Sequence, residues 1–444
     1  MYLDVSNFTH ITEVAHKKGH YGIEIVTVIL RKFFDIVHRV VDSNQGEIVK
    51  FGGDSCLILI CETGGSTAFL QCLKDIKTEL ISQFDQINDE FIEYYGIDFH
   101  VHGGLSYGMV NINIVGDKQY HLDYFIDGTP VMNAYTMCIK AGQDEIIDDL
   151  DGEIPSLPDP ERESQLPESK ADLTDEALFL PPQVKQKLLK GSRPAELRNV
   201  AVIFVHLEPE TEGPLDIHTY QGIYARIQHC VYGFDGIINK IDYTEKGYLI
   251  LICFGIPFIH TDDIERAFLC AIQIAKLNSP SLRIQLGINY SNIYAGIIGA
   301  ENRHEYGILG NAVNIAARLM SFAGGGEVAL SSEIVHRVNS RFEIEPLSVI
   351  QVKGIKEPIT INIVRRELPE RWLFYRNSFA DLPLVVEPER IAKLLQRLNR
   401  EEKVADSGLV SGSLRESDPA MDNPAECTSI RDRVDELILI TGAE

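Results

Sequence analysis

An internal repeat limits the fold of this chain more than any other feature of its sequence. Each half carries the tetrad Leu-Ile-Leu-Ile, at residues 57–60 and again at residues 249–252. Further along, the halves share the spacing of two glycines followed by a Gly-x-x-Val motif, at Gly104, Gly116 and Gly128 in the first half and at Gly287, Gly299 and Gly310 in the second. Such a repeat predicts two copies of one domain.

The alternation of short apolar runs with amphipathic stretches indicates the class of each copy. Helical periodicity covers residues 22–41 in the first copy and residues 218–232 in the second. Gly52 and Gly53 form a tight turn between two apolar runs, which predicts a β-hairpin. We therefore expect an α+β fold of two ferredoxin-like domains, in which helices cover a mainly antiparallel sheet.

Composition places the boundaries between these copies. We expect a first domain over residues 1–143, an acidic linker and lead-in helix over 144–197, a second domain over 198–366 and a C-terminal segment over 367–444. The linker is rich in Asp, Glu, Pro and Ser as far as residue 180, and a helix is predicted at 182–189. The C-terminal segment is expected to be partly disordered, because residues 403–426 contain few apolar side chains.

The end of the chain resembles the start of another kind of module. Residues 436–441 have the pattern of a buried strand that leads into Gly442, as in a phosphate-binding loop, but the Gly-Lys-Ser/Thr of such a loop is absent. We expect the start of a truncated ATPase-like module here. An ordinary C-terminal strand explains the pattern equally well.

Charge and cysteine usage limit the function classes. The formal net charge of -24 argues against a general nucleic-acid binder, because phosphates would be repelled. The eight cysteines include no C-x-x-C pair, and no leader or apolar stretch of about 20 residues is present. We therefore expect a cytoplasmic protein without a transmembrane segment.

Two carboxylates in the first copy form a candidate metal site. Asp4 follows an apolar strand, and Asp54 lies on the hairpin turn after Gly52 and Gly53, where the backbone can approach a ligand closely. Paired carboxylates at strand ends suit Mg²⁺ or Mn²⁺. Each Asp alone is explained as well by a role in stabilising its turn.

The second copy carries a complementary pair of polar residues. Asn314 and Arg318 are four residues apart in a predicted helix and therefore share one face, although a solvated helix surface would explain each of them alone. Their counterparts in the first copy are Met132 and Thr136. The second copy thus keeps two groups that the first copy lacks.

The reverse holds for the carboxylates. The counterpart of Asp4 is His206, and alignment of the tetrads makes Lys246 the counterpart of Asp54. This complementary loss predicts that the two domains pack head to tail about a pseudo-twofold axis, leaving one working site and one degenerate site.

Together these motifs resemble the tandem catalytic domains of class III nucleotidyl cyclases, and within that family the soluble, bicarbonate-responsive (type 10) adenylyl cyclases. The resemblance covers roughly residues 1–366 and rests on Asp4, Asp54, Lys240 and the run from Asn314 to Arg318. It implies conversion of ATP to 3′,5′-cyclic AMP and pyrophosphate, with two Mg²⁺ or Mn²⁺ ions at Asp4 and Asp54. Asn314 would orient the ribose, and Arg318 would stabilise charge on the transferring phosphoryl group.

The resemblance also assigns the nucleotide-binding residues. Lys240 would donate to the unprotonated ring nitrogen of adenine, which favours ATP over GTP. The remaining expected contacts to nucleotide are Lys353, Phe8, Thr9 and Gly307. Lys50 and Tyr135 would line the degenerate regulatory site, where the bicarbonate-responsive relatives accommodate bicarbonate.

Three positions depart from the family pattern. Gly307 stands where the family has a second side chain that contacts the base, and His100 stands where it has an arginine near the phosphates. Tyr135 replaces an arginine that pairs with the anion in the bicarbonate-responsive relatives. Two other functions stay open at this point: a catalytically silent cyclase-homology module that binds nucleotide and regulates an attached domain or partner, and a purely structural interaction protein.

Overall fold

The computed structural model describes residues 1–16, 21–61, 66–150, 176–189, 196–210, 215–244, 247–338, 342–351 and 358–368. All of them belong to one compact unit, Met1–Asn377. The predictions for residues 369–444, for Lys353 and for residues 151–175 of the linker lie outside the described residues.

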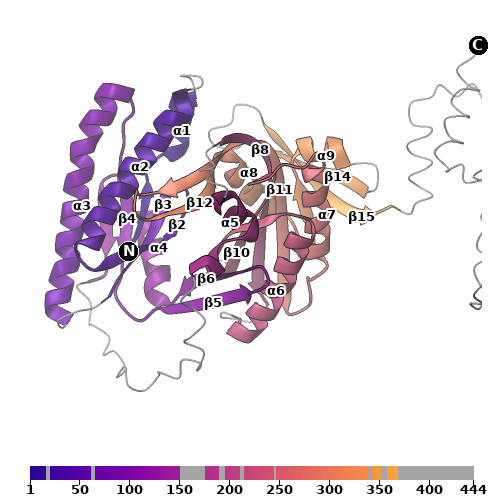
Figure 1. The fold of residues 1–444 in the computed structure, drawn as a ribbon, viewed down its shortest axis with the longest axis horizontal. Coiled ribbons are helices and arrows are strands. Elements are labelled where there is room, and N and C mark those ends of the chain that lie inside the picture. The colour runs from indigo at the N-terminus through magenta and orange to yellow at the C-terminus, as the bar shows by residue number, and fades with distance from the viewer. Residues whose placement is uncertain are drawn as a thin grey trace, which may run out of the picture. The chain divides into compact units, whose positions relative to one another are not determined.

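The first domain consists of a sheet covered by helices, together with a separate β-hairpin (Figure 1). Its strands are β1 (Tyr2–Val5), β2 (Gly46–Phe51), β3 (Ser55–Ile60), β4 (Val101–Leu105), β5 (Asn111–Asp117), β6 (His121–Asp127) and β7 (Glu145–Asp148). Its helices are α1 (Phe8–His16), α2 (Tyr21–Asp42), α3 (Ser66–Tyr95) and α4 (Thr129–Lys140). Within the described residues the main sheet has the order β2-β3-β1-β4-β7, and β5 pairs with β6.

Sequence periodicity explains how this domain buries its core. In α2, the apolar residues Ile29, Phe33 and Val37 recur every four positions, and all three are fully buried. In β1, Leu3 and Val5 point into the same core, so that Asp4, which lies between them, points to the opposite face of the sheet. The strand therefore presents one carboxylate outside the core.

The second domain repeats this plan. Its strands are β8 (Glu196–Pro209), β9 (Ile237–Thr244), β10 (Gly247–Phe254), β11 (Leu282–Gly299), β12 (His304–Leu309), β13 (Val328–Leu330), β14 (Phe342–Ile350) and β15 (Ile359–Glu367). Its helices are the 3-10 helix η3 (Glu176–Phe179), α5 (Pro182–Leu189), α6 (Ile217–Gly233), α7 (Asp263–Ala275), α8 (Asn311–Met320) and α9 (Ser332–Val338). The described strands follow the order β14-β15-β13-β11-β8-β10-β9, in which β9-β10-β8-β11-β13 matches β2-β3-β1-β4-β7 of the first domain.

Two glycines confirm the repeat at atomic detail. A Cβ atom placed on Gly104 would lie 2.0 Å from the Ala134 carbonyl oxygen of α4, and one placed on Gly287 would lie 2.1 Å from the Ala316 carbonyl oxygen of α8. In both copies, glycine therefore lets a helix rest directly on the sheet. The match also makes α4 and α8 equivalent helices, in which Met132 is the counterpart of Asn314.

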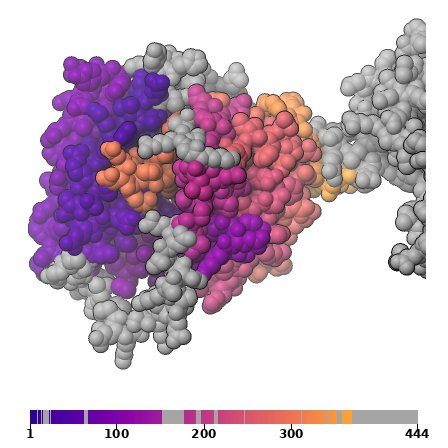
Figure 2. All heavy atoms as spheres, in the orientation of Figure 1, coloured from indigo at the N-terminus to yellow at the C-terminus, as the bar shows by residue number. Residues whose placement is uncertain are grey.

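Each domain extends a hairpin arm onto the other. The arm β5–β6 of the first domain places Val115 and Phe125 in the core of the second domain. The arm β11–β12 of the second domain places Ile298 and Ala300 in the core of the first domain. Figure 2 shows the second arm, in orange, set into the indigo surface of the first domain. The expected α+β fold with two domains paired head to tail is thus observed.

Strand register corrects one sequence alignment. Asp4 lies opposite Ser55, and its counterpart His206 lies opposite Leu249. The tetrads are therefore offset by two residues, and the counterpart of Asp54 is Tyr248 rather than Lys246. Because side chains alternate with a period of two along a strand, a shift of two residues preserves the apolar pattern and could not be detected from the sequence.

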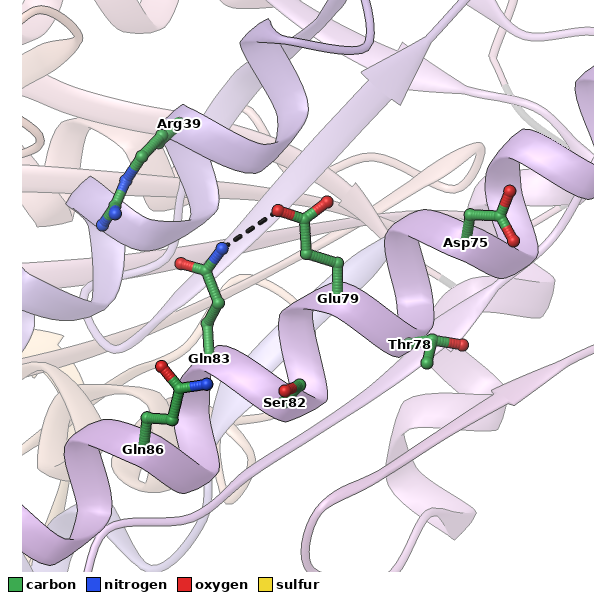
Figure 3. Close-up of a pocket in the computed structure, with 7 residues that line it drawn as sticks. All are labelled: Arg39, Asp75, Thr78, Glu79, Ser82, Gln83 and Gln86. Carbon is green, nitrogen blue, oxygen red and sulfur yellow. Dashed lines mark hydrogen bonds between the residues drawn. The ribbon is translucent and has the colours of Figure 1, made fainter.

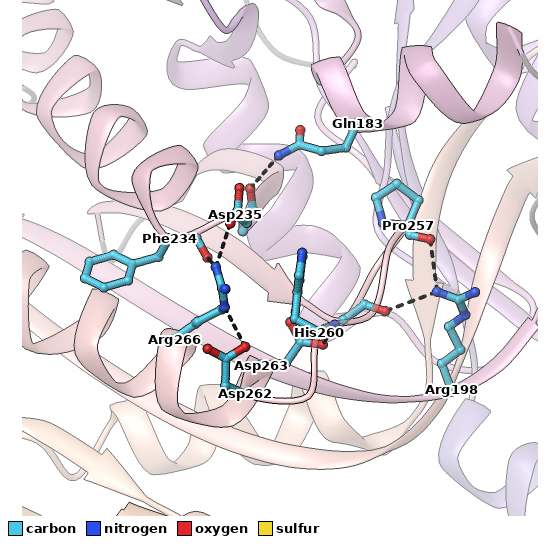
Figure 4. Close-up of polar contacts among 11 residues, drawn as sticks. Gln183, Arg198, Phe234, Asp235, Pro257, His260, Asp262, Asp263 and Arg266 are labelled. Atoms are coloured by element: carbon cyan, nitrogen blue, oxygen red, sulfur yellow. Dashed lines mark hydrogen bonds and ion pairs between the residues drawn. The ribbon is translucent and has the colours of Figure 1, made fainter. Parts of the chain in front are cut away.

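The boundary of the first domain also differs from the prediction. Residues 145–148, which were assigned to the linker, form the strand β7, and β7 pairs in parallel with β4. The predicted helix at 182–189 is present as α5, and hydrogen bonds tie it to the second domain. Gln183 donates to the Gly236 carbonyl, and the Pro257 carbonyl accepts from Arg198 (Figure 4). Lys187 donates to the same Pro257 carbonyl and to the carboxylate of Glu196.

Candidate active site

A cavity of about 320 Å³ lies where the two domains meet. Seven of the predicted residues line it, and they come from both copies: Asp54 belongs to the first copy, and Lys240 and Asn314 belong to the second. Phe8, Gly307, Lys50 and Tyr135 line it as well. Its size is within the range of sites for small molecules.

The two carboxylates lie at one end of the first sheet. Asp4 is adjacent to Ser55 across the β1–β3 pairing, and the amide of Val5 donates to the Asp54 carbonyl oxygen at 3.1 Å. Asn7 then adopts a left-handed backbone conformation, with a φ of 54°, which turns the chain into α1. The carboxylates are therefore held close to the N-terminus of a helix, where backbone amides favour anions.

Both carboxyl groups have pKa values above the ordinary value for aspartate. Burial and the charge of Asp54 raise the pKa of Asp4 to about 8. Burial also raises the pKa of Asp54 to about 6, although Lys240 opposes this effect. Two neighbouring carboxylates with raised pKa values require a compensating positive charge when both are ionised.

Divalent cations would supply that charge. Asp4 and Asp54 offer hard oxygen ligands side by side, and His102 Nε2 is 3.7 Å from Asp4. Among the described residues, no group of three or more His, Cys, Asp or Glu side chains forms a complete metal site. The pair therefore fits metal ions that share their remaining ligands with a substrate, as Mg²⁺ commonly does with phosphates.

Lys240 reaches the boundary between the copies. Its ammonium group donates to the backbone carbonyl of Phe51 in the first domain and lies 3.2 Å from Asp242 on its own strand. The Asn239 side chain is fixed by a hydrogen bond of 2.9 Å to the Tyr306 carbonyl. Asn239 and Asp242 line the cavity, but sequence reasoning did not select them.

Helix α8 presents the predicted amide and guanidinium. It begins after Gly310, whose φ of 146° allows the chain to turn out of β12. Ala312 and Ala316 face inward and are fully buried, whereas Asn314 and Arg318 are exposed on the other side. Asn314 lines the cavity, and Arg318 lies one turn beyond it, outside the lining residues.

The remaining predicted contacts are only partly described. Phe8 is the first residue of α1 and lines the cavity, and Thr9 is the second residue of the same helix. Lys353 lies outside the described residues. On β12, Gly307 lines the cavity together with Glu305, a residue that the sequence analysis missed although it lies two positions away on the same strand face.

Around Lys50, the cavity wall is held together by contacts within the chain itself. The Lys50 ammonium lies 3.3 Å from Asp123 and 4.2 Å from the centre of the Tyr124 ring. Tyr135 packs against Tyr2, with ring centres 4.2 Å apart. The predicted degenerate site thus contains an internal ion pair and two packed aromatic rings.

A second hollow lies far from these groups in the fold. It has a volume of about 630 Å³ and is formed mainly by polar side chains of α3 (Figure 3). Its residues are Arg39, Asp75, Thr78, Glu79, Ser82, Gln83 and Gln86. Gln83 donates to Glu79 within it, but it contains no apolar wall and no contribution from the second domain, which is typical of a helix surface rather than a substrate site.

Comparisons with known proteins give a family match over both domains. The sequence profile described as adenylate and guanylate cyclase catalytic domain matches residues 1–146 and 197–365. Adenylate cyclase type 10 from Homo sapiens is 26% identical over 392 residues, which cover 73% of this chain and 24% of that protein. The Mus musculus protein of the same name is 24% identical with the same coverage. The chain thus spans about a quarter of the length of these curated relatives.

Two solved cyclase structures match part of this chain. The adenylyl cyclase CyaB from P. aeruginosa is 24% identical with a TM-score of 0.35, over 39% of this chain and 99% of that chain. The guanylyl cyclase Cya2 is 25% identical with a TM-score of 0.33, over 38% of this chain and 93% of that chain. In the described part of this chain, no helix is long and apolar enough to cross a membrane.

Proposed function

Because the chain belongs to the family of adenylate and guanylate cyclase catalytic domains, we propose that it converts ATP to 3′,5′-cyclic AMP and pyrophosphate at the cavity between its two copies. One observation carries the proposal: Asp54 of the first copy and Lys240 and Asn314 of the second copy line the same cavity. The human relative named adenylate cyclase type 10 supports ATP as the substrate.

In this reaction, the ribose 3′-oxygen attacks the α-phosphorus. The new O3′–Pα bond closes the cyclic phosphate, the bond from Pα to the bridging oxygen breaks, and pyrophosphate leaves with that electron pair. The proton of the 3′-hydroxyl is lost to solvent. Two divalent cations held by Asp4 and Asp54 would supply positive charge at the triphosphate and lower the pKa of the 3′-hydroxyl.

The other residues act by position and charge. Asn314 orients the ribose through its amide, and Arg318 provides a delocalised cation for the charge that develops on the α-phosphoryl group. Lys240 donates to N1 of adenine, an atom that is protonated in guanine. Phe8 and Thr9 lie at the start of α1, where backbone amides can bind phosphate oxygens, and Lys353 is assigned to the terminal phosphate by family resemblance.

Product analysis tests this proposal. The full chain is incubated with Mg²⁺ or Mn²⁺ and either ATP or GTP, with and without bicarbonate, and the products are separated chromatographically. Cyclic AMP from ATP, with little cyclic GMP from GTP, is the expected result. Binding of ATP without turnover would instead favour the silent regulatory module, and a rate unchanged by bicarbonate would remove the regulatory role expected for Lys50 and Tyr135.

A further inference from the structure

Strands β9 and β12 do not pair with each other in the described sheet, but both present polar side chains to the same cavity, and the Asn239 side chain of β9 bonds to the Tyr306 carbonyl of β12. On β9, Lys240 and Asp242 line the cavity, and on β12, Glu305 and Gly307 do so. Glu305 and Gly307 are two residues apart on one strand. The Glu305 side chain therefore lies on the same face of the strand as a side chain at position 307 would. A carboxylate at position 305 can therefore extend into space that position 307 leaves open.

The Glu305 carboxylate has unused hydrogen-bonding capacity. Within the part of the chain that the structure describes, no donor lies within hydrogen-bond or ion-pair distance of it. The cations whose charges reach it are bonded elsewhere: Lys240 to Asp242, Lys50 to Asp123, and Arg303 to the Ile48 carbonyl at 3.1 Å. Burial raises the pKa of Glu305, while these cations oppose the rise.

The equivalent carboxylate in the other copy is satisfied. Gly116 and Gly299 occupy matching places in the two arms, because an added Cβ atom would lie 2.5 Å from the carbonyl of His121 in one arm and of Arg303 in the other. This correspondence makes Asp123 the counterpart of Glu305. Asp123 pairs with Lys50 at 3.3 Å and accepts from the Tyr124 amide at 2.7 Å. The difference indicates that Glu305 is left open for a ligand rather than for the fold.

Position 307 offers no competing acceptor. Glycine has no side chain, and a Cβ atom there would lie 2.8 Å from Cδ1 of Ile298, so a larger residue would displace that side chain. The part of the cavity between Lys240, Glu305 and Gly307, called the base slot below, therefore has a hydrogen-bond donor in Lys240 and a free acceptor in Glu305.

We propose that Glu305 is a specificity-determining residue that accepts a hydrogen bond from the N–H donor on the Watson–Crick edge of the purine, next to the atom that Lys240 contacts. The proposal rests on the proposed function for the identity of the ligand. With ATP, the donor is the 6-amino group of adenine, which lies beside N1. With GTP, the donors would be N1–H and the 2-amino group, beside O6.

Removing the donor from the ligand and the acceptor from the protein tests this pairing. Dissociation constants are measured calorimetrically on the full chain with Mg²⁺ for nonhydrolysable forms of ATP and of purine riboside triphosphate, which lacks the 6-amino group. A hydrogen bond to a charged acceptor predicts that the unsubstituted protein prefers the ATP form by roughly 10-fold or more. In Glu305→Ala this preference should fall to about 1. Glu305→Gln keeps an acceptor oxygen at the end of the side chain, so this variant should keep part of the preference.

The matched control is Asp123→Ala, which removes the equivalent carboxylate and should leave the preference unchanged. An equal loss of affinity for both nucleotides in Glu305→Ala would overturn the proposal, because it would indicate a purely structural role. A GTP analogue bound more tightly than the ATP analogue, with that preference lost in Glu305→Ala, would support guanine as the base that Glu305 contacts. Product analysis is scored separately: absence of cyclic AMP together with a preference that depends on Glu305 would reject the cyclase reaction but not the recognition of the base.

Discussion

The two halves of the central cavity differ most clearly at one pair of equivalent positions, Gly307 and Phe125. In the half near Lys240, Gly307 leaves room beside the ammonium group. In the half near Lys50, the Phe125 ring fills the equivalent position and packs edge-on against Tyr220 and Tyr248. A duplicated domain can thus retain its fold while the position equivalent to Gly307 carries a packed aromatic ring.

The end of the site that is proposed to bind metal ions also differs between the two copies. His206, the counterpart of Asp4, is buried and bonded to Gln285 at 3.0 Å. Tyr248, the counterpart of Asp54, donates to the Leu215 carbonyl at 3.3 Å. Both replacement side chains form hydrogen bonds within the protein. Asp4 and Asp54 instead have raised pKa values, which a bound cation would lower.

The largest expected effect comes from this pair. Asp54→Asn should reduce cyclic AMP formation by at least about 100-fold, because it removes a charged metal ligand. The melting temperature at pH 8 should stay the same or rise, since the substitution also removes a buried carboxylate whose pKa is raised to about 6 and whose ionised form destabilises the fold above that pH. Rate assays and thermal unfolding measure the two effects.

Tyr248→Phe is the matched control at the equivalent position. It removes one hydrogen bond, worth about 1 kcal/mol of stability, and should leave the rate within about twofold. Equal losses of activity in Asp54→Asn and Tyr248→Phe would show that the two ends are not functionally different.

The second comparison concerns the helices α8 and α4. Arg318→Ala should lower kcat by about 10²–10³-fold, with a smaller change in KM, because the guanidinium acts mainly on charge in the transition state. Thr136→Ala, at the equivalent position of α4, removes only a hydroxyl that bonds to the Met132 carbonyl of its own helix and should have little effect. A fall in affinity alone, with kcat retained, would assign Arg318 to ground-state binding.

The base slot gives the third prediction. Gly307→Phe introduces the residue type of the equivalent position and should weaken ATP binding by about tenfold or more, while the circular dichroism spectrum remains that of a folded protein. The expected cause is occupation of the cavity next to Lys240. Unchanged affinity in a calorimetric titration would mean that the base binds elsewhere.

The smallest expected effect concerns His100, which supports the turn between β1 and α1. The His100 carbonyl accepts from the Ser6 amide at 2.8 Å, and the His100 ring contacts Asp144 at 2.5 Å and Asp98 at 3.0 Å. Burial lowers the pKa of His100, but the hydrogen bonds to Asp144 and Asp98 outweigh it and raise the pKa above its usual value. The stabilisation is therefore fully present below about pH 6.5 and is lost as pH rises through the raised pKa.

This sign predicts that His100→Gln lowers the melting temperature by about 2 °C at pH 6 and by less at pH 9. Arg283, at the equivalent position, carries a guanidinium in place of an imidazole and pairs with Glu208 at 3.6 Å on the surface. Arg283→Gln should therefore have the same small effect at both pH values. An effect of His100→Gln that does not depend on pH would contradict the assignment of a protonated imidazole.

Much of the fold followed from the sequence because the repeat and the apolar periodicity are strong signals. The helices at 22–41, 182–189 and 218–232 are observed within a residue or two of the predicted ends, as α2, α5 and α6. The strand β7 was missed because it is only four residues long and lies beside the acidic linker. Short strands that complete a sheet depend on their neighbours rather than on local pattern.

Residues of the candidate site could be predicted from sequence where the residue type is distinctive. The pairing of equivalent positions was harder to predict where it depends on strand register. Asp54, Lys240 and Asn314 were selected from sequence, and they line one cavity in the structure. Tyr248 was not recognised as the counterpart of Asp54, because a shift of two residues preserves strand alternation. Glu305 was passed over because its value depends on the lack of a partner, which no sequence pattern reveals.

The central claim is that groups from both copies hold a single nucleotide. Calorimetric titration of the full chain with a nonhydrolysable ATP analogue and Mg²⁺, repeated on Asp54→Asn and Gly307→Phe, tests it most directly. The account predicts one site per chain, an affinity whose Mg²⁺ dependence disappears in Asp54→Asn, and an affinity that falls in Gly307→Phe. Two independent sites per chain, or binding that neither substitution weakens, would contradict it.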